Sequence, residues 1–230
     1  MFKKFLVPPD VFFRHAIISR AVGGSQQILD VGGSLGELRK FLPNVSITTA
    51  DVMEGGDILF NGKKLPLDTG SYETVISVDT LEHIPQKERL SFVKELCRVA
   101  KKSIVLLAPY GSSEHTLAEK QLAEAYRRSG KEIPHYLQEH IKYGLPGDSF
   151  LRSLEKEFGA VIGLSGRLWF DRINFSIHAF EVRNGKLNRL LYNGKYLWNF
   201  CANSIIVPWI SIVAPAQSST SRFLARIDKE

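Results

Sequence analysis

The chain has 230 residues, of which 44% are hydrophobic and 23% charged, so it can bury a core and is not a disordered segment. Its length fits one α/β domain, and we expect a single domain over residues 1–230. The net charge is +6, but the basic residues are spread along the chain, so no nucleic-acid partner is expected. Two distant cysteines, Cys97 and Cys201, form neither a disulfide framework nor a metal site. We expect a reducing, cytoplasmic location and no bound metal.

Two apolar stretches resemble membrane or export segments without meeting their requirements. The N-terminus begins like a signal peptide, but Pro8, Pro9 and Asp10 interrupt its apolar run, so no export is expected. Residues 204–216 are apolar but too short to span a bilayer. A buried strand is the simpler interpretation of this segment, and peripheral contact with a membrane surface is the alternative.

Hydrophobic periodicity and turn residues predict alternating strands and helices along the chain. In chain order we expect a helix at residues 9–21, a strand at 27–31, a short helix at 37–42, strands at 45–51 and 72–78, a helix at 86–100, and strands at 103–108, 160–164 and 222–227. The strand at 103–108 is apolar on both faces, which is typical of a parallel sheet covered by helices on both sides. The pattern therefore predicts a doubly wound α/β domain.

Two segments outside this pattern are expected to cover a substrate. Residues 111–147 are polar and helical, and they carry several histidines and tyrosines. A further helix follows, capped by Asp148 or Ser149. Residues 169–198 are rich in aromatic side chains and are not assigned to an element. Because specificity residues often lie in segments that cover the ligand edge of a sheet, we interpret 111–147 and 169–198 as substrate-cover segments.

A glycine-rich turn follows the first predicted strand and indicates a ligand site. In doubly wound sheets, ligands bind beyond the carboxyl ends of the strands, where glycines allow close approach of the backbone. Gly32, Gly33 and Gly36 form such a turn. Asp51 ends the next strand, about 20 residues further on, where a carboxylate can accept hydrogen bonds from two ribose hydroxyls. Together they indicate an adenosine-type ligand.

Two other motifs overlap the same turn. A dinucleotide-binding fingerprint needs a glycine where Val31 stands, which weakens a nicotinamide-dependent oxidoreductase. Residues 32–36 also spell the nucleophile elbow of an α/β-hydrolase, with Ser34 as the nucleophile. The elbow requires a further strand upstream, and there is no room for one before Ile28, so a hydrolase is disfavoured.

A third interpretation covers much more of the chain. The segments ILDVGGSLGEL, ITTADV, LPLDTGSYETVISVDTLEHIP and KKSIVLLAPYG, within residues 28–111, closely resemble the class I S-adenosylmethionine-dependent methyltransferases in order and spacing. The resemblance implies a mostly parallel, seven-stranded, Rossmann-like sheet whose last strand is antiparallel. A helical cover and an aromatic-rich insertion would precede that last strand. It also implies S-adenosylmethionine as the cofactor, bound across the first two strands.

The resemblance further implies which residues bind the cofactor. Asp30 and the glycine turn would hold the methionyl part, Asp51 the ribose, and Asn61 the edge of the adenine. The full set of implied cofactor residues is Asp30, Gly32, Gly33, Gly36, Asp51, Val52, Asn61, Gly62, Asp79 and Leu81. Ser34 and Asn61 replace the glycine and the aspartate that the family usually has at these positions.

The acceptor is expected to be a small molecule, with a sugar or lipid-linked saccharide hydroxyl as the proposed class. Loss of a hydroxyl proton needs a base, and a histidine that is neutral near pH 7 is suited to that role. His83 and His140 are the expected catalytic residues. A structural role beside Glu82 is an equal alternative for His83. A methyltransferase-like binding module without turnover is the alternative function.

Overall fold

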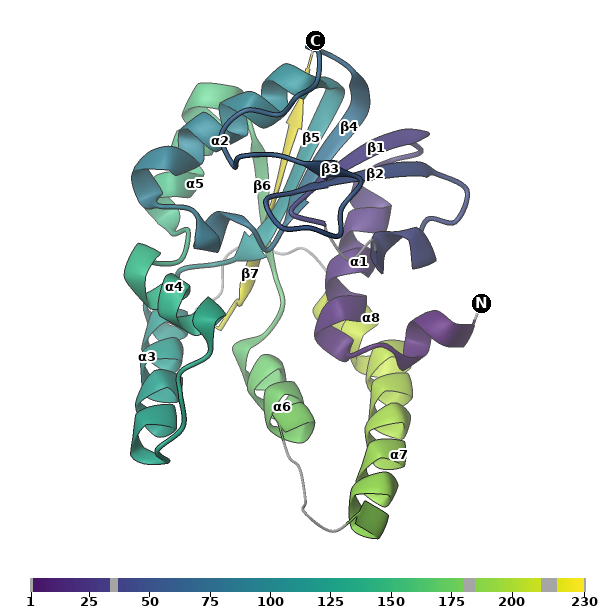
Figure 1. Ribbon diagram of the computed structural model, residues 1–230, viewed down its shortest axis with the longest axis vertical. Helices are drawn as coiled ribbons and strands as arrows, with labels where there is room; N and C mark the ends of the chain where they lie inside the picture. Colours follow the sequence, from purple (N-terminus) through teal and green to yellow (C-terminus); the bar gives the residue numbers. More distant parts are fainter. Residues whose placement is uncertain (1, 34–36, 180–184, 212–218, 230) are drawn as a thin grey trace.

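A seven-stranded sheet forms the centre of the protein (Figure 1). The computed structural model describes residues 2–33, 37–179, 185–211 and 219–229. The strands are β1 (Gln27–Val31), β2 (Ser46–Asp51), β3 (Ile58–Leu59), β4 (Tyr72–Val78), β5 (Ala100–Pro109), β6 (Val161–Ser165) and β7 (Arg222–Asp228), in the spatial order β3-β2-β1-β4-β5-β7-β6. In this sheet β7 alone runs in the opposite direction to the other strands. The described part of the chain therefore has the expected mostly parallel, Rossmann-like architecture.

Helices cover both faces of the sheet and extend beyond its lower end in Figure 1. The helical elements are η1 (Phe2–Leu6), α1 (Pro9–Ala21), η2 (Glu37–Lys40), η3 (Leu81–His83), α2 (Gln86–Val99), α3 (Ser113–Arg128), α4 (His135–Tyr143), α5 (Asp148–Phe158), α6 (Leu168–Ala179), α7 (Gly185–Cys201), the π-helix η4 (Ala202–Ile206) and α8 (Val207–Ile210). Helices α2 and α5 lie on one face of the sheet, and α1 and α8 lie on the other. Helices α3, α4 and α6 gather beyond the carboxyl ends of the parallel strands.

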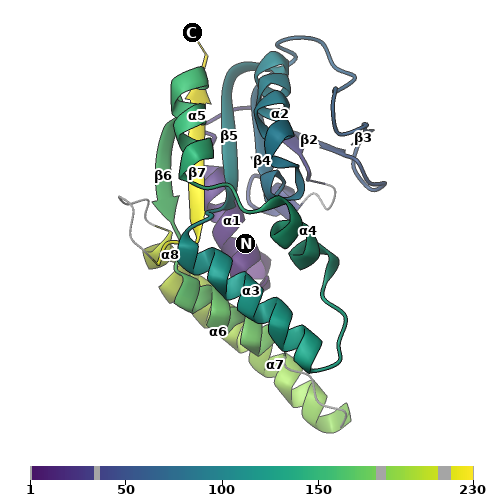
Figure 2. The same ribbon diagram turned by 90° about the vertical axis from the view of Figure 1, so that its left-hand side faces the viewer.

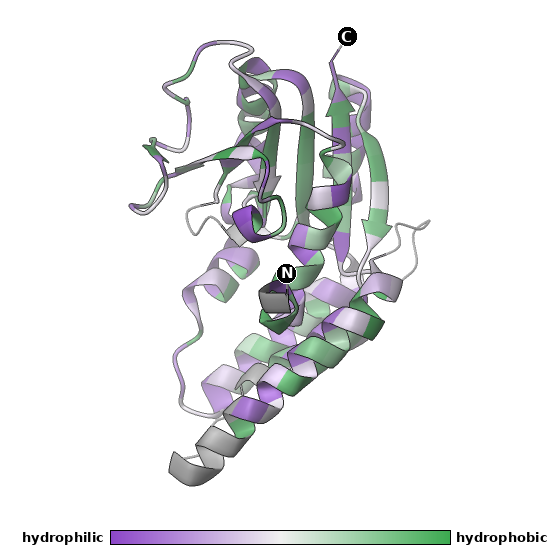
Figure 3. Cartoon of the chain, turned by 90° about the vertical axis from the view of Figure 1, so that its right-hand side faces the viewer, coloured by the Kyte–Doolittle hydropathy of each residue, from purple (hydrophilic) through white to green (hydrophobic). Residues whose placement is uncertain are grey.

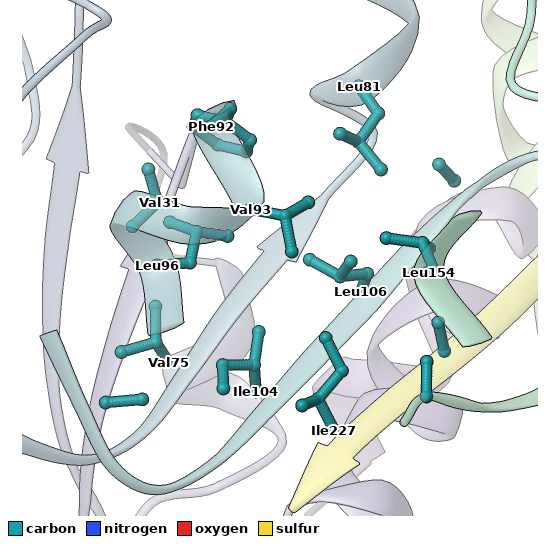
Figure 4. Packing of buried hydrophobic residues seen from close by; sticks show 14 of the residues in the cluster. Val31, Val75, Leu81, Phe92, Val93, Leu96, Ile104, Leu106, Leu154 and Ile227 are labelled. Atoms are coloured by element: carbon teal, nitrogen blue, oxygen red, sulfur yellow. The ribbon is translucent and has the colours of Figure 1, made fainter. Parts of the chain in front are cut away.

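The central strand β5 joins two hydrophobic cores. Successive side chains of a strand point to opposite faces of the sheet. Accordingly, Ile104 and Leu106 pack on the side of α2, while Val105 and Leu107 pack on the side of α1. Figure 4 shows the core on the side of α2, and Figure 3 shows hydrophobic residues along the central strands. Burial of residues 103–108 on both faces explains why this part of β5 is a nearly continuous apolar run.

One segment differs from its expected structure. Residues 204–216 were predicted to form a buried strand, but 204–210 lie in η4 and α8. Pro208 stands in the first turn of α8, directly after the π-helix η4, whose wider turn is a common feature where a helix is locally irregular. Ile205 and Trp209 are exposed while Val207 and Ile210 are buried. The strand prediction is therefore wrong for 204–210, and 212–216 lie outside the described residues.

Smaller differences concern caps and short elements. The N-cap of α5 is Gly147 and not Asp148 or Ser149, and no side chain caps this helix. Asp148 instead accepts a hydrogen bond from the Tyr110 hydroxyl. The unassigned segment 169–198 lies largely in α6 and α7. Among the described residues, no helix combines the length and apolar character needed to cross a bilayer.

Candidate functional site

The first part of the site lies where β1 ends. Asp30 is only 4% exposed, and its Oδ1 has no hydrogen-bond partner among the described residues. Desolvation by burial raises the pKa of Asp30 from 3.8 to about 7; it outweighs the lowering effect of the Arg39 charge, and the Asp51 charge adds a smaller increase. A Cβ atom on Gly33 would lie 2.2 Å from Oδ2 of Asp30. The backbone at Gly33 therefore passes directly over a buried carboxyl group, and only glycine fits there.

Gly32 is constrained in a different way. Its φ angle is +90°, and its N–H donates to the Ala50 carbonyl oxygen at 2.8 Å. A Cβ atom at this position would meet the Thr80 hydroxyl at 2.3 Å. The start of the turn is thus fixed between β2 and the segment after β4. Gly36 and Ser34, which were also singled out, lie outside the described residues.

The end of β2 supplies a carboxylate and two exposed apolar side chains. Asp51 is largely buried, and its Oδ1 accepts a 2.8 Å hydrogen bond from the Met53 N–H, which fixes the turn after the strand. Val52 and Met53 are 56% and 70% exposed, an unusual state for residues next to a buried strand. A Cβ on Gly62 would lie 3.3 Å from Cγ1 of Val52. The structure thus places Asp51, Val52 and Gly62 close together, as expected for residues that bind one cofactor.

Asn61 is exposed beside this group, but its side-chain oxygen already accepts hydrogen bonds from the backbone. Oδ1 accepts hydrogen bonds from the backbone N–H groups of Lys63 at 3.0 Å and Lys64 at 3.1 Å. A ligand at this point would therefore meet the amide NH₂ of Asn61. That group can donate a hydrogen bond to a ring nitrogen, one of the two roles an asparagine can have.

Asp79 lies between two arginines at the end of β4. It has a φ of 50°, the only positive value for a non-glycine residue in the described chain. Oδ2 accepts from Arg14 at 2.6 Å, and Oδ1 accepts from Arg222. Burial alone would raise the pKa of Asp79, but the charges of Arg222 and Arg14 lower it to about 2. A direct contact of Asp79 with the cofactor stays a prediction, because both oxygens are engaged.

The DTLEH segment after β4 continues into η3 and meets α4. Leu81 is buried in the core, and Glu82 is 1% exposed. Oε2 of Glu82 has no hydrogen-bond partner among the described residues. Burial, with a contribution from Asp79, raises the pKa of Glu82 well above its usual value. Arg89 donates to the backbone oxygens of Leu81, Ile84, Tyr143 and Gly144, which fastens η3 to the end of α4.

The two histidines predicted as bases lie side by side although they are far apart in sequence. The ring centroids of His83 and His140 are 5.1 Å apart. Nδ1 of His83 is 2.8 Å from Oε2 of Glu139, and Nδ1 of His140 is 2.7 Å from Oε1 of Glu119. Each imidazole thus has Nδ1 on a carboxylate, and within the described part of the chain Nε2 has no hydrogen-bond partner.

A cavity of about 830 Å³ adjoins His140. Its walls come from the start of α1, from α3, α4 and α6, and from the ends of β5 and β7; the helices are seen from the side in Figure 2. Both expected cover segments contribute to the cavity. Segment 111–147 supplies Glu119, Tyr136 and His140, and segment 169–198 supplies Asp171, Arg172 and Phe175. Asp10, Asp171 and Arg222 were not expected from the sequence, because no local motif marks them.

Solved structures resemble this chain in fold. No protein-family model and no curated protein matches the sequence. An S-adenosylmethionine-dependent methyltransferase from Archaeoglobus fulgidus superimposes with a TM-score of 0.52 and 12% identity, over 94% of this chain and 92% of that chain. A possible histamine N-methyltransferase from Thermotoga maritima gives 0.52 and 15%, over 96% and 91%. The plantazolicin methyltransferase BpumL, in complex with a triazolic desmethylPZN analog and SAH, gives 0.56 and 13%, over 97% and 86%. The chain therefore has the fold of the class I S-adenosylmethionine-dependent methyltransferases.

Proposed function

We propose that this protein is an S-adenosylmethionine-dependent methyltransferase that acts on a small molecule. The observation that carries the proposal is the group of Asp30, Gly33, Asp51 and exposed Val52 at the carboxyl ends of β1 and β2. These strand ends are where doubly wound sheets bind nucleotide-like ligands. The likeness of the fold to methyltransferases supports the proposal.

The residues fit the cofactor by their chemistry. Asp30 offers a buried carboxyl oxygen without a partner among the described residues, which suits the cationic methionyl end. Asp51 would accept hydrogen bonds from the ribose hydroxyls, and the apolar surface of Val52 would lie against the adenine ring. When bound, the cofactor supplies a methyl group that is already activated on a sulfonium. The protein's task is then mainly to position the acceptor, which requires few catalytic residues.

The cavity beside His140 is the proposed acceptor site. Its charged and polar walls, with Asp10, Arg172 and Asn174, suit a molecule with several hydroxyls, and Tyr136 and Phe175 offer apolar faces. These features support a sugar or lipid-linked saccharide as the acceptor class. His140 lines the cavity and is the group that would meet the reacting hydroxyl.

The test compares adenosine ligands directly. S-adenosylhomocysteine, S-adenosylmethionine and NAD are titrated into the purified protein by calorimetry, and melting temperatures are measured in parallel. A ligand that binds the folded state raises the melting temperature. We expect a clear shift with the first two ligands and none with NAD. A shift with NAD alone would instead indicate an oxidoreductase.

Binding without turnover would indicate the non-catalytic alternative. A panel of free sugars and lipid-linked saccharides, incubated with methyl-labelled cofactor, tests for an acceptor. Transfer of label to one of them supports the enzyme, and cofactor binding with no transfer to any acceptor class supports a binding module.

A further inference from the structure

Glu82, His83 and His140 form a compact set of metal-ligating groups, here called the Glu-His-His cluster. One oxygen of Glu82 and one ring nitrogen of each histidine all lie within 4.8 Å of one another. Ligand atoms of a tetrahedral site with bonds of about 2.0–2.2 Å lie about 3.3–3.6 Å apart. Side-chain movements of about 1 Å are therefore enough to close this cluster around an ion.

The surroundings of the two histidines match those of metal-binding imidazoles. A metal-ligating histidine usually donates its other ring N–H to a carboxylate, which fixes the tautomer and orients the ring. Glu139 does this for Nδ1 of His83 at 2.8 Å, and Glu119 does it for Nδ1 of His140 at 2.7 Å. Both rings thereby keep Nε2 for an ion.

The third ligand, Glu82, is buried, and one of its oxygens lacks a hydrogen-bond partner among the described residues. Glu82 is 1% exposed, and no described residue bonds its Oε2. Arg89 lies close by, but its side chain donates hydrogen bonds to backbone oxygens such as those of Leu81 and Gly144. A buried polar oxygen without a hydrogen-bond partner is costly, and a bound cation removes that cost.

We propose that Glu82, His83 and His140 bind one divalent transition-metal ion, which keeps an open coordination position beside the acceptor cavity. Two imidazoles and one carboxylate suit Zn²⁺, Co²⁺ or Fe²⁺, whereas Mg²⁺ and Ca²⁺ prefer oxygen ligands alone. Three protein ligands with an open position are also the pattern of catalytic metal sites. This site was not expected from the sequence, which shows no metal-ligand spacing.

The ion would have a structural and a chemical role. It joins η3, which follows β4, to the cover helix α4. His140 also lines the cavity, so an acceptor oxygen there can reach the open position, and a bound metal lowers the pKa of a coordinated hydroxyl. This second role rests on the proposed methyltransferase function, whereas metal binding itself does not. The histidines are then metal ligands and not bases.

The experiment uses the full chain, stripped with a chelator and titrated with Zn²⁺ or Co²⁺ alone. We expect one ion per chain, and with Co²⁺ a visible absorption spectrum typical of nitrogen and oxygen ligands. Glu82→Gln, His83→Gln and His140→Gln should each weaken binding at least about a hundredfold, because each removes a ligand. Glu119→Gln and Glu139→Gln should weaken it about 10-fold to 100-fold, because they only orient the histidines.

Glu132→Gln is the matched control for the glutamate variants, since Glu132 is exposed just before α4 and is neither a ligand of the cluster nor one of the carboxylates that orient the histidines. Its metal affinity should equal that of the wild type. Circular dichroism checks that each variant is folded, and the Co²⁺ spectrum of the wild type tests the site without any variant. The proposal is overturned if the stripped wild type binds these ions only at millimolar concentration, or if folded Glu82→Gln and His83→Gln variants bind them as the wild type does.

A separate titration distinguishes this proposal from the cofactor proposal. S-adenosylhomocysteine affinity should be nearly the same before and after metal removal, because Asp30 and Asp51 are not part of the cluster. If the protein binds S-adenosylhomocysteine but no metal ion, the metal proposal fails and the methyltransferase proposal remains. If the protein binds the metal ion but not S-adenosylhomocysteine, the metal site remains and its proposed role in activating an acceptor fails.

Discussion

Arg14 of α1 donates a 2.6 Å hydrogen bond to Oδ2 of Asp79, at the carboxyl end of β4. This contact joins the lead-in helix to the edge of the sheet where the candidate site lies. Arg222, the first residue of β7, binds the other oxygen of the same carboxylate. One aspartate in a left-handed conformation therefore connects three segments from distant parts of the chain.

Asp79→Asn should lower the free energy of unfolding by about 3–5 kcal/mol, because it leaves the largely buried Arg222 without its paired carboxylate and Arg14 with Asp10 alone. Asparagine tolerates the left-handed backbone, so the loss reports on charge and not on strain. Urea unfolding near neutral pH measures it. Asp68→Asn, at an exposed position, should change stability by less than about 0.5 kcal/mol. Equal effects of the two substitutions would contradict the assignment.

The stability contributed by Asp79 should also depend on pH. Its pKa in the folded protein is lowered from 3.8 to about 2. The contribution is therefore fully present above the unfolded value and is lost as the pH falls from about 4 toward about 2. Wild type and Asp79→Asn should approach each other in stability over this window. A constant difference between them in acid unfolding would speak against the lowered pKa.

Asp51→Ala should weaken S-adenosylhomocysteine binding about a hundredfold or more, since charge-assisted hydrogen bonds contribute about 1.5–3 kcal/mol each. Asp51→Asn keeps an oxygen to accept from the Met53 N–H, so it should preserve the turn while still weakening binding. Calorimetry gives both affinities, with the exposed Glu54→Gln as the control. Unchanged affinity in a folded Asp51→Ala protein would remove the ribose assignment.

Affinity for S-adenosylhomocysteine should rise with pH through the titration of Asp30. The pKa of this residue is raised to about 7, so it is mostly neutral below that pH and attracts a cationic group only above it. Titrations between about pH 6 and about pH 8 should show tighter binding at the higher value, by at most about tenfold per unit. Asp30→Asn should flatten this dependence. The same profile in both proteins would show that Asp30 is not the titrating group.

The same raised pKa gives a stability effect of opposite sign to that of Asp79. Because the folded value lies above the unfolded 3.8, the contribution of neutral Asp30 is present at low pH and is lost as the pH rises toward about 7. Asp30→Asn should therefore gain stability relative to wild type between about pH 4 and about pH 7. Parallel urea titrations across this range measure the gain, and no gain would mean that Asp30 is ionised throughout.

Gly33→Ala should lower both the melting temperature and S-adenosylhomocysteine affinity. The added methyl group would lie 2.2 Å from the Asp30 carboxyl group, and overpacking costs about 1–3 kcal/mol. Gly194→Ala is the matched control, because nothing lies within 4 Å of a Cβ there and the residue is inside α7. That substitution should stabilise the protein by about 0.5–1 kcal/mol. A Gly33→Ala protein as stable as the Gly194→Ala protein would contradict the close approach.

The sequence predicts most of the fold, because the main elements have local signals. The expected bounds of β1, β4 and α1 agree with the structure, and those of α2 and β7 differ by one residue. Strand β3 was missed because two residues, Ile58 and Leu59, show no periodicity. The short helix α8 was taken for a strand because an apolar run hides the helical pattern that only burial reveals.

The candidate site was predictable only where its parts are close in sequence. Asp51 and the glycine turn follow from strand ends and motifs, and Val52 follows from the family resemblance. Glu119, Glu139, Arg14 and Arg222 were missed because their partners lie between 21 and 143 residues away along the chain. The folded topology brings such groups together, and no local pattern indicates it.

The antiparallel strand β7 lies between β5 and β6 in the sheet, although α6 and α7 separate it from β6 along the chain. In the described sheet, β6 pairs with β7 alone. A nascent chain that has emerged only as far as α7 therefore exposes an unpaired edge on β5 and a β6 segment without a partner. Such edges are sites for wrong pairing with other chains. Synthesis of this protein should thus include a period of vulnerability to aggregation that ends only when residues 222–228 leave the ribosome and dock.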